Sequence, residues 1–391
     1  MKAIYYNIFG IGHINPTLPV VAALRERGVK IFYHSSPARR EIIEASGAKF
    51  VNYGRDDYQA SDFNPNKNFV LQTIPATVGL LPFLRAEFER IQPDFILYDS
   101  MAIWGHVMAE IYKVPSFCTV ATFALPLSAK KETFQKHDVV ADDVTLKAME
   151  FLKRTYNVDL SLHQTLGAYG KNNIVFTAKE LNPKMSETNA GQFFYSGAMV
   201  KPATGKFSLS LKELKDSGKK IITMALGTIL LTEDPSVLNW YRAVIEAFKE
   251  ETNTILILAV GTEENKKLLG DLPDHIHLYT YIPQTEFLSF SDLFICHAGM
   301  NSVNEALHIG VPMILIPHSK DQFVNAKRVE EMELGVVIEK NEVTPENIKK
   351  AAMIIENHPP LQENIDQMSE HFQNHLGLDG IMSYIFERVN L

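Results

Sequence analysis

Cysteine is scarce in this chain, which excludes a fold that depends on a network of disulfides. The 391 residues contain only two cysteines, Cys118 and Cys296, and each lies in an apolar run. Small cysteines in apolar runs are typical core residues of proteins from a reducing compartment. The sequence therefore predicts a cytoplasmic protein with both thiols in its core.

Two further absences argue against membrane and nucleic-acid partners. No stretch reaches the about 18 uninterrupted apolar residues that a membrane-spanning helix needs. The apolar N-terminus lacks the basic region and the small-residue cleavage site of a signal peptide. The formal net charge is −8 and no basic stretch offsets it, so a nucleic-acid partner is not expected.

The order of apolar runs and helix-like segments indicates an α/β protein with two domains. Short apolar runs alternate with amphipathic segments over 1–200 and again over 220–375, a pattern typical of parallel sheets covered by helices. Residues 201–219 are poorer in apolar side chains and include Pro202 and Gly205, so we expect the interdomain linker there. A last helical segment is expected within 376–391.

His13 and Asp99 are the chemically interesting residues of the first half. His13 lies on the turn after the first apolar run, and Asp99 ends the run 95–99, just before a helix expected at 101–112. Parallel strands could place the two side chains together, and a carboxylate that orients an imidazole makes a general base. The alternatives are a structural histidine and an aspartate that caps the helix. Gly10-x-Gly12 resembles a dinucleotide fingerprint, but Asn15 replaces its third glycine.

A second candidate site follows the apolar run 293–296. Gly299 carries no Cβ, so a ligand can approach the backbone closely, and Asn301 or Ser302 occupies the expected N-cap of a helix. The free N–H groups and the positive dipole end of such a helix suit a phosphate, to which His297 can add a donor or a cation. Glu305, about one turn further, can accept hydrogen bonds from sugar hydroxyls. The alternative is an ordinary capped helix with a packed histidine.

Neighbouring strands of the second half end in residues of the same kind. Gly227 and Thr228 follow the run 220–225, and Asp321 and Gln322 are expected on the loop after the run 313–317. Because ligands bind where the carboxyl ends of parallel strands meet, we expect one crevice to be lined by His297, Gly299, Asn301, Ser302, Glu305, Asp321 and Gln322. The small residue Gly227 lets the backbone approach a ligand there, and Thr228 can donate a hydrogen bond to a phosphate.

These residues carry a family resemblance. The stretch His297–Gln322 resembles the nucleotide-sugar signature of the family 1 glycosyltransferases, most closely that of bacterial macrolide and flavonoid glycosyltransferases that use UDP-glucose. The resemblance implies the GT-B fold, in which two Rossmann-like domains with parallel sheets face each other across a cleft. It spans nearly the whole chain and is weakest at 52–75 and 119–170. It also implies that the final helix, 379–389, returns to the first domain.

The resemblance assigns a role to each candidate residue. It makes His13 the catalytic base, on a loop that includes Gly12, with Asp99 as its partner. Tyr281, where the family usually has tryptophan, would stack on uracil, and Gln284 would hold the ribose or the edge of the base. Asp321 and Gln322 would contact the glucose 3- and 4-hydroxyls. The expected donor-binding residues are Gly12, Gly227, Thr228, Tyr281, Ile282, Gln284, His297, Gly299, Asn301, Ser302, Glu305, Asp321 and Gln322.

The implied activity is an inverting, metal-independent transfer of glucose from UDP-glucose to a hydroxyl of a small hydrophobic acceptor. No cofactor is expected beyond the donor substrate. Met101, Trp104, Phe117, Phe123 and Phe134 are candidates for an acceptor pocket, although most aromatic residues at such spacings are core. The rival interpretations are a sugar-nucleotide epimerase, a cell-wall amino-sugar transferase, and a non-catalytic helper that binds nucleotide sugar.

Overall fold

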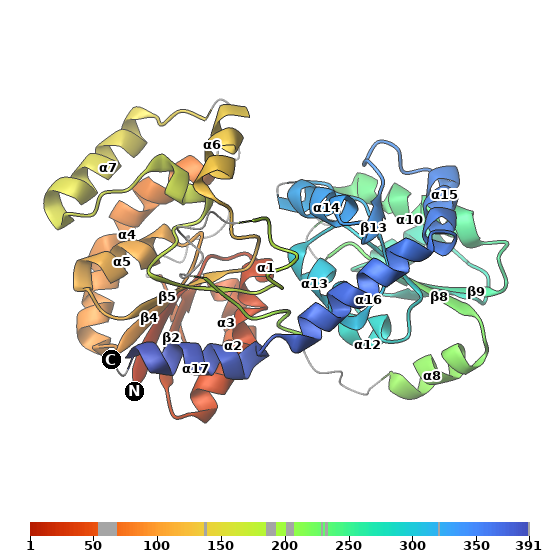
Figure 1. Cartoon of the computed structure of the whole chain (residues 1–391), viewed down its shortest axis with the longest axis horizontal. Coiled ribbons are helices and arrows are strands. Elements are labelled where there is room, and N and C mark those ends of the chain that lie inside the picture. The colour runs from red at the N-terminus through yellow and green to blue at the C-terminus, as the bar shows by residue number, and fades with distance from the viewer. Residues whose placement is uncertain are drawn as a thin grey trace. The chain divides into compact units, whose positions relative to one another are not determined.

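The computed structural model describes residues 1–53, 69–136, 139–184, 193–200, 207–227, 230, 234–319 and 321–389. They form two compact units (Figure 1). The N-terminal unit comprises Met1–Met199 and His375–Leu391, and the C-terminal unit comprises Val200–Asn374. Each unit contains an all-parallel sheet with helices on both faces, which confirms the α/β class and the two Rossmann-like halves.

The N-terminal unit has a seven-stranded sheet in the order β3-β2-β1-β4-β5-β6-β7. Its strands are β1 (Lys2–Tyr6), β2 (Lys30–Ser35), β3 (Lys49–Asn52), β4 (Phe95–Asp99), β5 (Ser116–Val120), β6 (Asn172–Val175) and β7 (Phe193–Tyr195). Its helices are α1 (Ile11–Ile14), α2 (Thr17–Glu26), α3 (Arg40–Ala45), α4 (Phe69–Ile91), α5 (Ile103–Tyr112), α6 (Leu127–Lys136), α7 (Asp143–Tyr156) and α17 (Gly377–Val389), with 3₁₀ turns at Pro37–Arg39 and Leu162–Leu166.

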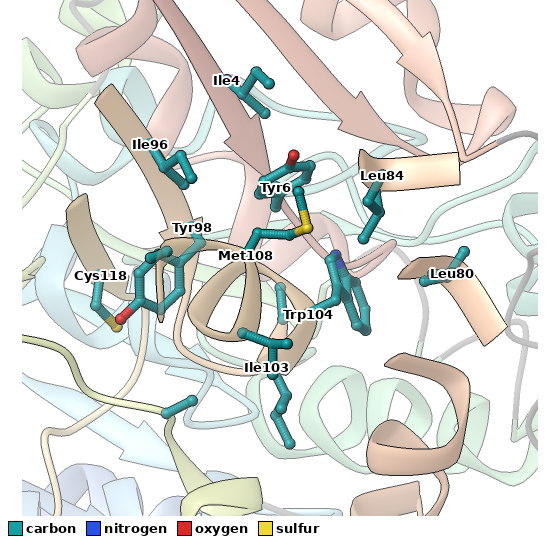
Figure 2. Close-up of a cluster of buried hydrophobic side chains, with 14 of the residues drawn as sticks. Ile4, Tyr6, Leu80, Leu84, Ile96, Tyr98, Ile103, Trp104, Met108 and Cys118 are labelled. Atoms are coloured by element: carbon teal, nitrogen blue, oxygen red, sulfur yellow. The ribbon is translucent and has the colours of Figure 1, made fainter. Parts of the chain in front are cut away.

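Strand β1 explains why this sheet needs helices on both faces. Successive side chains of a strand point to opposite faces, and four of its five residues are buried. Tyr5 belongs to a core with residues of α2 and α17. Tyr6 lies on the other face, where Figure 2 shows it beside Trp104 and Met108 of α5. Burial on both faces makes such strands continuous apolar runs in the sequence.

The C-terminal unit has a six-stranded sheet in the order β10-β9-β8-β11-β12-β13. Its strands are β8 (Lys220–Ala225), β9 (Thr254–Ala259), β10 (Ile276–Tyr279), β11 (Leu293–Cys296), β12 (Met313–Leu315) and β13 (Gly335–Val337). Its helices are α8 (Ser208–Asp216), α10 (Leu238–Phe248), α11 (Glu263–Leu269), α12 (Gln284–Leu288), α13 (Met300–Ile309), α14 (Asp321–Glu331), α15 (Pro345–Glu356) and α16 (Pro359–Asn374), with a 3₁₀ turn at Pro235–Val237.

Several boundaries differ from the sequence-based expectation. Helix α4 begins at Phe69 and continues through Pro75 and Pro82, although proline is normally read from sequence as a helix breaker. Residues 208–216, inside the stretch expected to be a linker, form α8. The final helix α17 lies in the N-terminal unit, where its Tyr384 ring stacks on Phe194.

Two smaller expectations are also answered. Cys118 and Cys296 are both free and buried, as the sequence predicts. Across the described part of the chain, every helix is too short or too polar to cross a bilayer.

Candidate functional site

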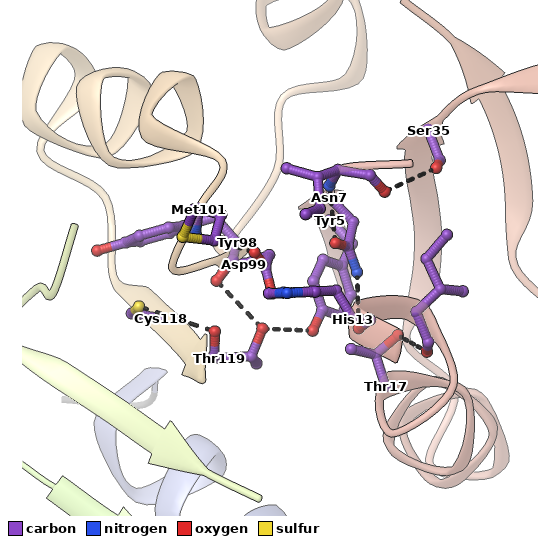
Figure 3. A network of polar contacts seen from close by, with 12 residues as sticks. Tyr5, Asn7, His13, Thr17, Ser35, Tyr98, Asp99, Met101, Cys118 and Thr119 are labelled. Carbon is purple, nitrogen blue, oxygen red and sulfur yellow. Dashed lines mark hydrogen bonds and ion pairs between the residues drawn. The ribbon is translucent and has the colours of Figure 1, made fainter. Parts of the chain in front are cut away.

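His13 and Asp99 form a hydrogen-bonded pair in the N-terminal unit. The Nδ1 atom of His13 lies 2.8 Å from Oδ2 of Asp99, and the carboxylate is fully buried whereas the imidazole is 20% exposed. Figure 3 shows the imidazole pointing at the end of β4 from the turn that follows β1. The structure thus brings together two residues that are 86 positions apart in the sequence.

The second carboxylate oxygen of Asp99 has a structural task. Oδ1 accepts a hydrogen bond from the backbone N–H of Met101 at 2.9 Å and so stabilises the turn that leads into α5. The helix itself begins at Ile103, two residues later than expected. Asp99 therefore does not cap α5, whose N-cap is Ala102. One of its oxygens stabilises the preceding turn and the other lies against the imidazole.

Buried polar contacts fix the strands around this pair. Asn7, just after β1, donates from Nδ2 to the carbonyl of His13 at 3.2 Å. The hydroxyls of Tyr5 and Thr119 lie 2.7 Å apart and tie β1 to β5 on either side of β4 (Figure 3). Thr119 in turn donates to the carbonyl of Tyr98, next to the carboxylate. Because each partner is buried, the imidazole and the carboxylate are held on a rigid frame.

The sheet topology explains why the pair forms at this place. From β1 the chain proceeds outward to β2 and β3, whereas β4 leads outward on the other side to β5, β6 and β7. Such a reversal leaves a crevice at the carboxyl ends of the two central strands. The C-terminal unit has the same reversal between β8 and β11, and Gly227 and His297 follow those two strands.

In the C-terminal unit, two glycines flank the ring of His297. A Cβ added to Gly299 would lie 2.6 Å from Nε2 of His297, and one added to Gly227 would lie 3.1 Å from Cε1. Gly227 also has φ +79°, a conformation that favours glycine. The two glycines therefore make room for the imidazole itself, which adds to the close-approach role expected of Gly299.

The N-terminus of α13 differs from the expected geometry. The helix begins at Met300 and its N-cap is Gly299, so the N-cap expected at Asn301 or Ser302 was wrong. Asn301 and Ser302 instead occupy the second and third helical positions. A glycine N-cap has no side-chain oxygen for the first N–H groups, which leaves the anion-binding character of this helix end intact.

Burial determines the charge of His297. It lowers the pKa of His297 to about 4, with a smaller contribution from His318, so the imidazole is neutral near pH 7. In the chain without a ligand, the lowered pKa favours the alternative in which His297 is a neutral donor. A neutral imidazole can still donate one hydrogen bond.

Three of the expected donor residues join in one hydrogen-bonded group. Gln284, the first residue of α12, donates from Nε2 to Oγ of Ser302 at 3.1 Å and to Oε2 of Glu305 at 2.6 Å. Both hydrogen bonds use the amide nitrogen of Gln284, so its carbonyl oxygen is the atom that can accept a hydrogen bond from a ligand. Tyr281, three residues earlier, is 69% exposed and presents a flat ring, whereas Ile282 is 4% exposed and belongs to the core.

Asp321 and Gln322 lie on a helix and not on the expected loop. They are the first two residues of α14. Oε1 of Gln322 accepts hydrogen bonds from the backbone N–H groups of His318 and Ser319, at 2.9 Å and 3.1 Å. The amide nitrogen of Gln322 is therefore the atom that can donate a hydrogen bond to a sugar hydroxyl.

The remaining expected residues are placed as follows. Gly12 is an exposed residue of α1, and a Cβ there would meet nothing within 4 Å. Thr228 lies outside the described residues. The acceptor-pocket candidates Trp104, Phe117, Phe123 and Phe134 are at most 6% exposed, so they are core residues as the plainer interpretation held.

Two features of this region were not expected from the sequence. His318 lies 3.0 Å through Nε2 from Oδ2 of Asp234, which joins the segments after β12 and β8. Asn325 of α14 donates from Nδ2 to the carbonyl of Ala298 at 2.9 Å. The position of His318 at the end of a strand was a usable signal, whereas nothing in the sequence around Asn325 indicates a contact 27 positions away.

Known proteins resemble this chain over nearly its whole length. A family model described as the erythromycin biosynthesis protein CIII-like C-terminal domain matches residues 246–375. A Bacillus licheniformis protein named NDP-glycosyltransferase YjiC is 30% identical over 94% of this chain and 92% of its own. A Bacillus subtilis protein named as an uncharacterized UDP-glucosyltransferase, YdhE, is 29% identical over 97% and 96% of the two chains.

The fold has a close match among solved structures. The crystal structure of CalG4, the calicheamicin glycosyltransferase, superposes with a TM-score of 0.81 at 23% identity and covers 98% of both chains. At that identity the likeness establishes the GT-B fold, while the sequence matches establish the family. The chain therefore belongs to the YjiC-like family 1 glycosyltransferases, enzymes with the GT-B fold.

Proposed function

We propose that this glycosyltransferase moves glucose from UDP-glucose to a hydroxyl of a small hydrophobic acceptor, with inversion at the anomeric carbon. The observation that carries the proposal is the 2.8 Å contact between His13 and the buried Asp99. A natural-product acceptor such as a macrolide, a flavonoid or another phenol agrees with family membership and with the calicheamicin named for CalG4.

His13 is the proposed base. With Nδ1–H directed at Asp99, the basic lone pair of the ring is on Nε2, the nitrogen on the far side of the imidazole. Nε2 takes the proton of the acceptor hydroxyl while the oxygen bonds to the anomeric carbon. The bond from that carbon to the diphosphate breaks, and its electron pair leaves with UDP. The carboxylate of Asp99 stabilises the imidazolium that forms.

The C-terminal unit is the proposed donor-binding half. The first N–H groups of α13 and the neutral His297 donate to the diphosphate, and the helix dipole favours the charge that develops on the leaving group. We therefore propose that no metal ion is required. Tyr281 stacks on uracil, Gln284 and Glu305 hold the ribose, and Asp321 with Gln322 contacts the sugar hydroxyls.

The proposal is tested first by product analysis. Purified protein is incubated with UDP-glucose, UDP-GlcNAc or dTDP-glucose and a panel of phenols and macrolides, and products are identified by mass spectrometry. We expect the acceptor to gain one hexose from UDP-glucose, with a β-linkage by NMR and with turnover unchanged by EDTA. Transfer from dTDP-sugars alone would overturn the donor assignment.

Replacement of the base separates a transferase from a nucleotide-sugar-binding helper. His13→Ala should lower kcat by about 10²–10⁴-fold, the usual contribution of a general base. UDP affinity, measured by calorimetry, should be retained because His13 lies outside the proposed donor-binding unit. Unchanged turnover in His13→Ala would contradict the proposed mechanism.

A further inference from the structure

Asn325 has no role in the proposed donor site, yet its side chain contacts the turn that carries His297 and Gly299. The residue lies on α14, its side chain is 1% exposed, and Nδ2 donates to the backbone carbonyl of Ala298 at 2.9 Å. Ala298 sits between His297 and Gly299, in the turn from β11 into α13. The other polar atom of the Asn325 amide, Oδ1, is buried with no hydrogen-bond partner among the described residues. The side chain is therefore held in the interior by its bond to this one turn.

The backbone of Ala298 shows why the turn needs a fixed partner. Its φ is +61°, in the left-handed region that side chains with a Cβ disfavour. The other described non-glycine residues with positive φ are Gln92, Lys113, Asn157 and Glu333. Each of those four follows the end of a helix, where the left-handed conformation is common. Ala298 instead precedes a helix, so local sequence does not favour its conformation.

Helix α14 also organises the neighbouring strand end. Gln322, one turn before Asn325, accepts hydrogen bonds from the backbone of His318 and Ser319 after β12. One face of α14 thus holds the segments after both β11 and β12, which together carry the proposed diphosphate and sugar contacts.

We propose that Asn325 is a positioning residue that holds the His297–Ala298–Gly299 turn in the conformation required for binding the diphosphate of the donor. It acts through the carbonyl of Ala298 and touches no substrate. The inference rests on the proposed donor site, because it names the residue that keeps this site in shape. The inference makes two specific predictions. Loss of Asn325 should weaken nucleotide binding, and the loss should matter less when residue 298 is a glycine, which adopts positive φ without strain.

The test is a double-mutant cycle read by calorimetric titration with UDP. Asn325→Ala should raise the dissociation constant of UDP about tenfold, the order of effect expected from losing a buried hydrogen bond. In an Ala298→Gly background the same change should cost less than about threefold, because glycine adopts positive φ without strain. The donor KM should follow these constants while kcat changes little.

A matched control separates positioning from general destabilisation. Val329 is fully buried on the same helix and lies outside the turn. Val329→Ala should lower the melting temperature and leave UDP affinity unchanged. If Asn325→Ala does not fold, Asn325→Leu replaces it, since leucine has a similar volume and no donor.

The outcomes distinguish this inference from the proposed function. UDP binding by Asn325→Ala within twofold of the wild type would overturn the inference alone. A tenfold loss that persists in the Ala298→Gly background, or that Val329→Ala reproduces, would overturn it as well. Failure of the wild-type chain to bind UDP would overturn the proposed donor site and the inference with it.

Discussion

At the scale of single residues, Asp99 has two tasks. Its Oδ2 atom contacts His13, the proposed base, and its Oδ1 atom accepts a hydrogen bond from Met101 in the turn before α5. Asp99→Asn removes the charge and keeps the shape. Because Oδ1 must still accept from the N–H of Met101, the new amide NH₂ faces Nδ1 of His13. The imidazole then has to accept on Nδ1 and carry its proton on Nε2, so it cannot take a proton from the acceptor.

The expected result of Asp99→Asn is a fall in kcat of about 10²–10⁴-fold with little change in melting temperature. UDP affinity should remain that of the wild type. Asp99→Ala serves as the control, because it also removes the bond to Met101 and should destabilise the protein more. An Asp99→Asn enzyme with near-wild-type turnover would show that the tautomer of His13 does not matter.

The next scale is that of the structural elements, where α13 and its glycine N-cap provide a second prediction. Gly299 has an ordinary φ of −64°, so Gly299→Ala introduces no backbone strain. Its new Cβ would meet Nε2 of His297 at 2.6 Å and force the imidazole to move. We expect UDP affinity to fall about tenfold or more by calorimetry, since one lost hydrogen bond to a charged group has that effect.

A second change isolates the cause of this loss. In a His297→Ala background the imidazole is absent, so Gly299→Ala should have little further effect on UDP affinity. Equal losses in the two backgrounds would mean that the Cβ clashes with the nucleotide and not with His297.

The elements also show how far the sequence determines this fold. Strands buried on both faces, such as β4, are continuous apolar runs, so their existence and their parallel orientation were predictable. The start of α13 was not predictable, because Asn301 and Ser302 are good N-cap residues, whereas the actual N-cap is Gly299, which follows a left-handed Ala298. That conformation is accompanied by a contact with Asn325 from another helix, which local pattern does not reveal.

The same reasoning applies to the candidate site. His13 and Asp99 could be suggested as a pair from sequence because one follows an apolar run and the other ends one, at the edge of a parallel sheet where ligands bind. That β1 and β4 are neighbours is known only from the structure. The charge of His297 could not be predicted, because it depends on how completely the folded chain removes the ring from water.

At the scale of the whole molecule, each unit contains a histidine whose pKa lies well below its ordinary value, His34 in one and His297 in the other. In the N-terminal unit His34 is fully buried beside Tyr6 and Tyr53, and burial lowers its pKa from the ordinary 6.5 to about 4. Between pH 6.5 and about 4, His34 is protonated in the unfolded chain but remains neutral in the folded chain. The contribution of His34 to the free energy of unfolding is therefore fully present above pH 6.5 and is lost as the pH falls towards 4.

The two tryptophans allow this loss to be measured in one unit. Trp104 donates to the hydroxyl of Tyr53 and belongs to the N-terminal unit, whereas Trp240 belongs to the C-terminal unit. In a Trp240→Phe background, tryptophan fluorescence thus reports the unit that contains His34. Urea unfolding at several pH values between 7 and 4 then gives the free energy of unfolding of that unit.

Removal of His34 should make this unit less sensitive to acid. The difference between 6.5 and about 4 corresponds to about 3 kcal/mol for one buried histidine. His34→Leu, in the Trp240→Phe background, should flatten the pH dependence of the unfolding free energy by up to that amount. Replacing the exposed His358 by glutamine removes one histidine from the other unit and should leave the slope unchanged. Equal slopes with and without His34 would mean that its ring takes up a proton in the folded protein as readily as in the unfolded chain.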